Sequence, residues 1–453
     1  MSPHDPPPPL LLRGGTVLTL DSAATVFRGT DVLLQDGRIA WVGPVPEVPA
    51  GTRILDVTGG FVLPGLIQGH LHLGQTFFRG LAEERRLLAW LRERIWPLEA
   101  AHDDESAYWC SLLGAAECLL GGTTTIQDIG IGPGAKGLLD AIAVSGLRAF
   151  AGQCLMDSGD ELPAAMRAAT DAALAATEAL GDRFDRGPEG RLRYVLNPRF
   201  ILSCSDPLWE GIRDLAGRRG WPIHTHALEQ RDETEAVRQL KGGRDEIEYF
   251  AEQGVLAADL RLAHGVWLTA AHLTRVRHER FSVVHCPSSN LKLGSGIADL
   301  VAIRLSGVPV GLGCDGAACS NQLDNFQELR LAALLQKVQH GPAAFSGLDA
   351  LRLATSEGAH ALGLQHETGT LETGKRADVV VLAPGRPELW GAPEADPHDL
   401  VAFGASRAAV RHVVVDGHLL VEEGRLTRLD LEEILRESGR CLAALLRRAG
   451  LRL

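Results

Sequence analysis

Eight short, apolar, β-rich runs alternate with amphipathic helical stretches through the middle of this chain. This alternation is typical of parallel βα units, in which a helix connects each strand to the next and covers the sheet. Eight is also the number of strands that a closed βα barrel requires. We therefore expect an α/β fold with a TIM-like (βα)8 barrel over residues 65–368. The candidate strands are residues 66–72, 123–130, 147–157, 192–200, 221–229, 260–268, 281–289 and 308–316.

Both ends of the chain show a different pattern. Strand-like runs separated by glycine and aspartate turns fill residues 10–62, and similar runs recur between residues 377 and 421. We expect one small composite β-sandwich domain, with residues 1–64 and 369–453 as its two parts. The leucine-rich stretch 429–446 predicts an amphipathic terminal helix that covers its own barrel or packs on a second subunit of a homodimer.

The composition of the chain argues against nucleic-acid and membrane partners. The chain has 453 residues and 45% hydrophobic content, enough for a large buried core. Its formal charge of -12 argues against a nucleic-acid partner, which would favour clustered lysine and arginine. No stretch reaches about 18 uninterrupted apolar residues, and the proline-rich start lacks the apolar core of a signal peptide. We expect a cytoplasmic protein without a membrane partner, whose eight cysteines are reduced and mostly buried.

Polar side chains lie at or just beyond the C-terminal ends of five candidate strands. In a βα barrel this is the end where catalytic groups from different strands meet. Histidines two residues apart on a strand point to the same face, so His70 and His72 can bind one metal ion together. Any one of these residues alone is more often a hydrogen-bonded core residue, but the set predicts a shared site. Its members are His70, His72, His226, Glu229, His264, His285 and Asp315.

The motifs around these residues resemble the amidohydrolase superfamily. They are similar to its branch of aromatic deaminases and triazine hydrolases, which includes guanine deaminase, adenosylhomocysteine and methylthioadenosine deaminases, and ethylammeline chlorohydrolase. The resemblance covers nearly the whole chain and is specific for the superfamily, but much less so for the substrate. The motifs are PGLIQGHLH at 64–72, HALE at 226–229, AHG at 263–265, HCPSSNLKL at 285–293, GCDG at 313–316 and GTLETGKRAD at 369–378.

The resemblance implies one divalent metal ion per subunit, zinc first and iron second. Its ligands would be His70, His72, His226 and Asp315. Three neutral imidazoles and one carboxylate suit such an ion and leave a position for water. No lysine occurs in residues 192–200 or 221–229, which argues against the carboxylated lysine that bridges two metals in other members of the superfamily.

The resemblance also assigns catalytic roles beside the metal. Asp315 would take the proton of the attacking water, and His264 would orient the attacking oxygen. Glu229 would pass a proton to a ring nitrogen and then to the leaving amine. We therefore expect a metal-dependent deaminase of an aminated N-heterocycle, a purine base or purine nucleoside. The alternatives are a triazine chlorohydrolase or other amidine hydrolase, and an inactive barrel that serves as a binding or assembly subunit.

Five further residues are expected to contact the substrate. Gln75 and Arg199 resemble the guanine deaminase pattern, although Arg199 could instead pair with a local carboxylate. Trp90 and Glu99 resemble the adenosylhomocysteine deaminase pattern, in which the acid binds ribose hydroxyls, and simple packing is the alternative. His285, at the end of the seventh candidate strand, completes the set.

Overall fold

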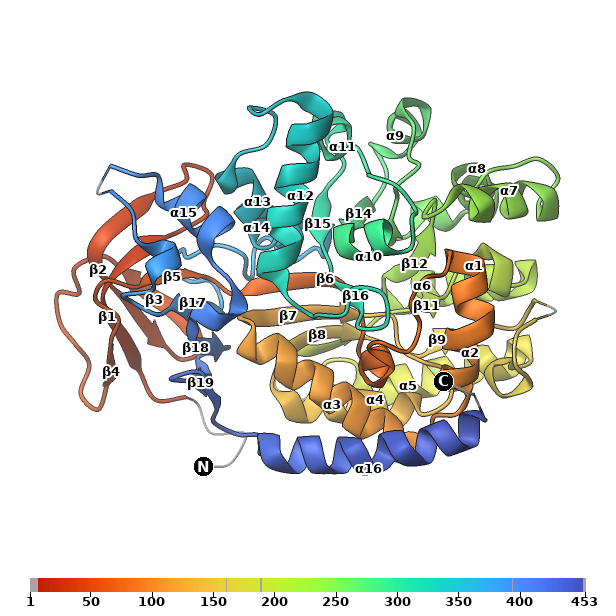
Figure 1. Cartoon of the computed structure of the whole chain (residues 1–453), viewed down its shortest axis with the longest axis horizontal. Coiled ribbons are helices and arrows are strands. Elements are labelled where there is room, and N and C mark those ends of the chain that lie inside the picture. The colour runs from red at the N-terminus through yellow and green to blue at the C-terminus, as the bar shows by residue number, and fades with distance from the viewer. Residues whose placement is uncertain (1–6, 160, 188–189, 393, 451–453) are drawn as a thin grey trace.

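The computed structural model describes residues 7–159, 161–187, 190–392 and 394–450, and each of the eight predicted barrel strands is present (Figure 1). The third, fourth and eighth strands are each divided into two short pieces. In chain order the strands are β6 (Leu66–His72), β7 (Thr123–Asp128), β8 (Arg148–Ala151) with β9 (Cys154–Leu155), β10 (Leu192–Tyr194) with β11 (Asn197–Pro198), β12 (Ile223–Ala227), β13 (Leu260–His264), β14 (Phe281–His285), and β15 (Val310–Leu312) with β16 (Asp315–Gly316).

Parallel pairing brings the last of these strands back to the first. β12 to β15 form one run of parallel neighbours, and β10, β8, β7, β6 and β16 form another. Asp315 on β16 lies opposite Leu71 on β6, and a parallel bridge joins Leu196 to Ile223 between the fourth and fifth strands. The predicted TIM-barrel-like α/β fold is therefore confirmed, and its C-terminal strand ends meet at one mouth.

Helices connect the strands and pack on the outside of the barrel, as α3 does against β7. A π-helical turn at Leu91–Ile95 separates α1 from α2. Pro97, in the first turn of α2, has no N–H to donate to the carbonyl of Glu93, so one α-helical hydrogen bond is missing there. The helices are α1 (Leu87–Trp90), α2 (Trp96–Ala100), α3 (Asp104–Leu120), α4 (Ala135–Ser145), α5 (Thr170–Phe184), α6 (Asp206–Arg219), α7 (Arg231–Leu240), α8 (Glu246–Glu252), α9 (Ala270–Val276), α10 (Pro287–Lys292), α11 (Leu300–Ser306), α12 (Asn325–His340), α13 (Gly347–Leu353), α14 (Ser356–Ala361), α15 (Pro397–Gly404) and α16 (Leu431–Ala449).

Strands from both chain ends share one nine-stranded sheet, drawn in red and blue at one end of the molecule in Figure 1. The two halves meet where β5 pairs antiparallel with β17, with Pro64 opposite Val379. The sheet contains β1 (Leu10–Leu18), β2 (Val26–Gln35), β3 (Arg38–Val42), β4 (Arg53–Asp56), β5 (Phe61–Pro64), β17 (Val379–Leu382), β18 (Val410–Val415), β19 (His418–Glu422) and β20 (Arg425–Leu426).

A buried ion pair fastens this sheet to the barrel. Arg148 on β8 donates to Asp378, just before β17, at 2.8 Å, and to Asp416 at 3.2 Å. All three side chains are buried. Removing one partner of a buried pair typically costs about 3–5 kcal/mol, because the remaining charge is left without compensation. The two parts of the molecule are thus joined by strong electrostatic contacts as well as by the chain.

The terminal helix α16 packs on its own chain. It runs beside α3 (Figure 1), and the guanidinium of Arg448 donates to the carbonyl of Ala101 at 2.8 Å. Cys441 and Leu445 are buried in the same apolar cluster as Trp90. The helix therefore packs on its own chain, as one of the two expected arrangements requires, and packing on a second subunit stays a prediction. All eight cysteines are free and buried, and none of the helices described is long and apolar enough to cross a bilayer.

Candidate active site

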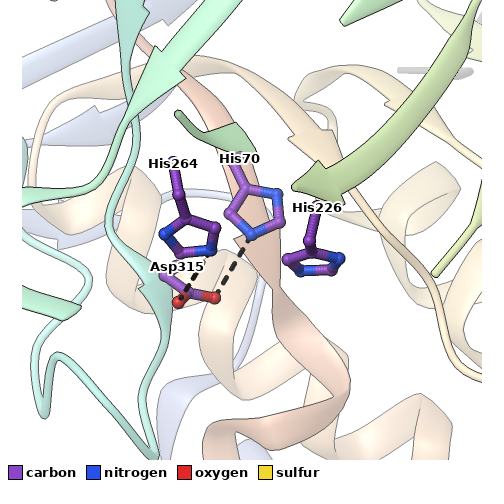
Figure 2. A group of neighbouring side chains, drawn as sticks. All are labelled: His70, His226, His264 and Asp315. Carbon is purple, nitrogen blue, oxygen red and sulfur yellow. Dashed lines mark ion pairs between the residues drawn. The ribbon is translucent and has the colours of Figure 1, made fainter. Parts of the chain in front are cut away.

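The predicted metal ligands come together at the C-terminal mouth of the barrel. The Nε2 atoms of His70 and His72 each lie 3.3 Å from Oδ1 of Asp315. The Nε2 atoms of His72 and His226 are 3.1 Å apart. Figure 2 shows His70, His226, His264 and Asp315 pointing toward one another, and one ligand atom from each lies within 4.8 Å of the others. Five side chains from four strands thus surround one point.

This arrangement fits a divalent cation. The Nε2 atoms of His70 and His264 are buried and have no hydrogen-bond partner among the described residues, a costly state without a ligand. Burial lowers the pKa of His70, and it lowers the pKa values of His72 and His226 well below the usual value. These imidazoles are therefore neutral near pH 7 and keep a lone pair for a metal. Three such nitrogens with a carboxylate form a donor set suited to zinc.

Neighbouring groups orient the ligands. Nδ1 of His226 donates to the carbonyl of Arg199 at 2.6 Å, which leaves Nε2 as the free acceptor. Nδ1 of His70 lies 3.0 Å from Nε2 of the buried His224. Sequence analysis missed His224, although His224 and His226 repeat the two-residue spacing that singled out His70 and His72.

Helix α10 holds two of the catalytic candidates. Ser289 donates to Oδ2 of Asp315 at 2.6 Å, and Nδ1 of His264 donates to the side-chain oxygen of Asn290 at 2.9 Å. His264 and Asp315 have φ values of 72° and 61°, a left-handed conformation that L residues rarely adopt. Burial opposes ionisation of Asp315, but the facing imidazoles lower the pKa of this carboxyl well below its usual value. Asp315 is therefore a carboxylate in a fixed orientation.

Glu229 lies next to His264, and its Oε2 atom is 3.5 Å from Nε2 of that imidazole. Burial, followed by the negative charge of Asp315, raises the pKa of Glu229 well above its ordinary value. The surroundings of Glu229 therefore favour its protonated form, the form that donates a proton to a substrate. The mouth thus holds two carboxyl groups whose pKa values are shifted in opposite directions.

A cavity opens onto these groups. Its apolar walls come largely from the segment that contains α1 and the π-helical turn, together with Phe200 and Leu293. Apolar walls with a few convergent polar groups suit a planar heterocycle. The lining residues are His72, Leu87, Trp90, Leu91, Arg199, Phe200, His226, Glu229, Glu233, His264, Leu293 and Asp315.

Of the five residues expected to contact the substrate, Trp90 and Arg199 line this cavity. Arg199 also pairs with Glu99 at 2.6 Å, and Gln75 donates to the other oxygen of Glu99 at 2.8 Å. Arg199 thus has a carboxylate partner, and the buried guanidinium and carboxylate compensate each other. Its contact with the substrate stays a prediction. His285 is fully buried and is not among the lining residues.

Glu328 on α12 binds the backbone of α10, and its ionisation should make the stability of the protein depend on pH. Its carboxyl accepts from the backbone N–H of Ser288 at 3.0 Å, and burial raises its pKa to about 8. Because the folded pKa exceeds the ordinary value of 4.5, the unfolded chain releases this proton first as pH rises. As pH rises from 4.5 to 8, the ionisation of Glu328 therefore lowers the free energy of unfolding, by about 1.4 kcal/mol for each pH unit.

Glu328→Gln removes the ionisation and keeps the shape. We expect the variant to gain stability relative to the parent protein as pH rises, by several kcal/mol between pH 5 and pH 8. Urea unfolding of both proteins at these two pH values measures the change. A stability difference that stays the same at both pH values would contradict the prediction.

A parallel barrel whose mouth gathers imidazoles and two carboxyl groups with opposite pKa shifts around one point defines a metal-dependent hydrolase. Comparison with known families gives the same class: the model described as Amidohydrolase family matches residues 61–420. The chain belongs to the amidohydrolase family.

Individual relatives agree with this assignment. The chain is 35% identical to a 5-methylthioadenosine/S-adenosylhomocysteine deaminase of Pelotomaculum thermopropionicum, over 95% of this chain and 97% of that protein. Among solved structures, an adenosine deaminase of Xanthomonas campestris with bound zinc has a TM-score of 0.88 at 28% identity, covering 97% of this chain and 98% of that one. The zinc complex of atrazine chlorohydrolase from Arthrobacter aurescens has a TM-score of 0.87 at 26% identity, covering 96% and 100%.

These findings confirm the activity predicted from the sequence. The protein is a hydrolase of carbon–nitrogen bonds in cyclic amidines, a deaminase, and its site supports a divalent metal.

Proposed function

We propose that this protein hydrolytically deaminates a purine nucleoside of the adenosine type and releases ammonia. The observation that carries the proposal is the position of Glu229, a carboxyl whose pKa burial raises, next to His264 in a cavity that Asp315 also lines. An amine needs a proton to leave, and Glu229 can supply it. The curated relative with 35% identity, named for nucleoside deamination, supports the substrate class.

In this proposal His70, His72, His226 and Asp315 hold one zinc ion, which when bound supplies a Lewis acid that lowers the pKa of water to roughly 7. Asp315 accepts the proton of the attacking water, and the Nε2 atom of His264 orients the attacking oxygen. The carboxyl of Glu229 gives its proton to a ring nitrogen, and the carboxylate that remains takes the second proton of the attacking oxygen and transfers it to the departing amine. The proton held by Asp315 then returns to Glu229, which restores both groups. The apolar cavity walls hold the base and exclude bulk water.

We further propose the division of the chain that its sequence indicates, with residues 1–64 and 369–453 as two parts of a β-sandwich domain around the barrel at 65–368. In support, β5 ends at Pro64 and β6 begins at Leu66, while β17 pairs with β5. Residues 1–6 and 451–453 lie outside the described part of the chain. A cytoplasmic location and a homodimer stay predictions.

Metal analysis combined with a substrate screen tests the function. The purified protein is assayed for ammonia with adenosine, methylthioadenosine, guanine, oxidised guanine, pterins and aminotriazines, and for chloride with a chlorotriazine. We expect about one metal ion per chain and ammonia from the adenosine-type nucleosides. Release of chloride without ammonia would favour the chlorohydrolase, and a protein with neither metal nor turnover would favour the binding subunit.

A further inference from the structure

Glu229 lies in a turn whose backbone N–H groups need hydrogen-bond acceptors from outside the turn. The turn joins β12 to α7, and its Leu228 is buried with a φ of 54°, in the left-handed region. The first N–H groups of a helix have no partner within the helix, so those at the entrance to α7 need an acceptor from elsewhere. Without one, a buried turn in this conformation would have two unpaired N–H groups beside the active site.

One carboxyl oxygen of Glu233 accepts both hydrogen bonds. Oε2 of Glu233 accepts from the N–H of Glu229 at 2.9 Å and from the N–H of Gln230 at 3.3 Å. An ordinary capping box satisfies the N-cap residue alone, whereas here the same oxygen also binds the backbone of Glu229. Glu233 is itself buried and lines the cavity, so the bond is shielded from competing water.

Two further contacts hold the same turn. The side-chain amide of Gln230 donates to the carbonyl of Leu293 at 3.0 Å, and Leu293 lines the cavity just after α10. The N–H of Trp267 donates to the carbonyl of Leu228 at 3.0 Å. The turn is therefore fixed to the loops that follow β13 and β14.

We propose that Glu233 is a positioning residue for the reaction, which holds the backbone of Glu229 so that its carboxyl faces His264 and the substrate. The expected effect of Glu233 on the reaction rate rests on the proposed function. The hydrogen bonds that it accepts can be tested without an activity assay. Misplacement of a reacting group by about 1 Å can cost about 10²-fold in rate. Loss of the bond should therefore lower kcat strongly while the cavity still binds the nucleoside.

The experiment compares Glu233→Ala, Glu233→Gln and a control, Glu235→Ala, which lies on the exposed side of the same helix. Amide hydrogen exchange of the peptide that contains Glu229 and Gln230 is measured in each full-length protein. We expect faster exchange in Glu233→Ala, near-parental exchange in Glu233→Gln because its amide oxygen still accepts the bonds, and no change in the control. Unchanged exchange in Glu233→Ala would overturn the proposal, whatever the substrate proves to be.

Kinetics with adenosine and with 6-chloropurine riboside provide the second test. We expect kcat for adenosine to fall about 10²-fold in Glu233→Ala, with little change in KM or metal content, and to recover largely in Glu233→Gln. The loss should be smaller for the chloride substrate, whose leaving group needs no proton. If the parent enzyme releases ammonia and Glu233→Ala does so at the parental kcat, the positioning role is overturned. If the parent releases none from any nucleoside, the proposed function fails, and the exchange result still decides the role of Glu233.

Discussion

Asp315→Asn is expected to abolish turnover, with a loss of about 10³-fold or more. Asp315 is both a ligand candidate and the proposed acceptor of the water proton, whereas an amide cannot accept that proton and is a weaker, uncharged ligand. The substitution is mild in every other respect. Asparagine tolerates the left-handed conformation at φ 61° better than most residues, and its oxygen can accept the bond from Ser289.

The measurements are steady-state turnover and metal content per chain, with circular dichroism as the check on folding. We expect a folded variant with weakened metal retention and no detectable ammonia release. Ser320→Ala, which alters a nearby hydroxyl that contacts only backbone carbonyls among the described residues, serves as the matched control. A rate within a few-fold of the parent for Asp315→Asn would reject the proposed role of this carboxylate.

Glu229→Gln should abolish deamination while leaving the metal in place. Glutamine has the shape of the protonated acid that burial favours at this position, so the cavity should stay intact. It cannot transfer a proton, however, and loss of general acid–base catalysis typically costs about 10²–10⁴-fold in rate. Glu229 contacts His264 and is not among the four predicted ligands, so the metal content should equal that of the parent protein.

Glu235→Gln, on the solvent-exposed side of α7, controls for the loss of a carboxylate in this segment. Metal content and ammonia release are measured on both variants. Normal deamination by Glu229→Gln would show that another group protonates the leaving amine. Loss of metal from this variant would instead mean that Glu229 supports the metal centre itself.

Much of the fold could be predicted because its signals are local. Each barrel strand is a short apolar run between turn residues, and the two-residue spacing of His70 and His72 places both imidazoles on one face of the first strand. The π-helical turn at 91–95 was not foreseen, because the amphipathic pattern of Leu87–Leu98 continues through it and the missing hydrogen bond at Pro97 leaves that pattern unchanged.

The site was predictable where the role of a residue follows from its own side-chain chemistry. It was less predictable where the role depends on which other residue the side chain contacts. The pairing of Arg199 with Glu99 joins residues 100 positions apart, and nothing near either of them reveals the other. Glu233 reads as an ordinary helix-start acid until the left-handed turn at Leu228 is known. Such contacts form between elements that are far apart in the sequence, so the pattern of one element does not reveal them.

The pairing of β5 with β17 has a consequence for synthesis in the cell. β5 lies between β1 and β17 in the sheet, and the whole barrel separates Pro64 from Val379 in the sequence. At about 5–20 residues per second, the ribosome needs about 15–60 seconds to deliver the missing strand. During that interval the nascent chain carries an unpaired strand edge, the feature through which unfinished proteins aggregate and that chaperones must shield.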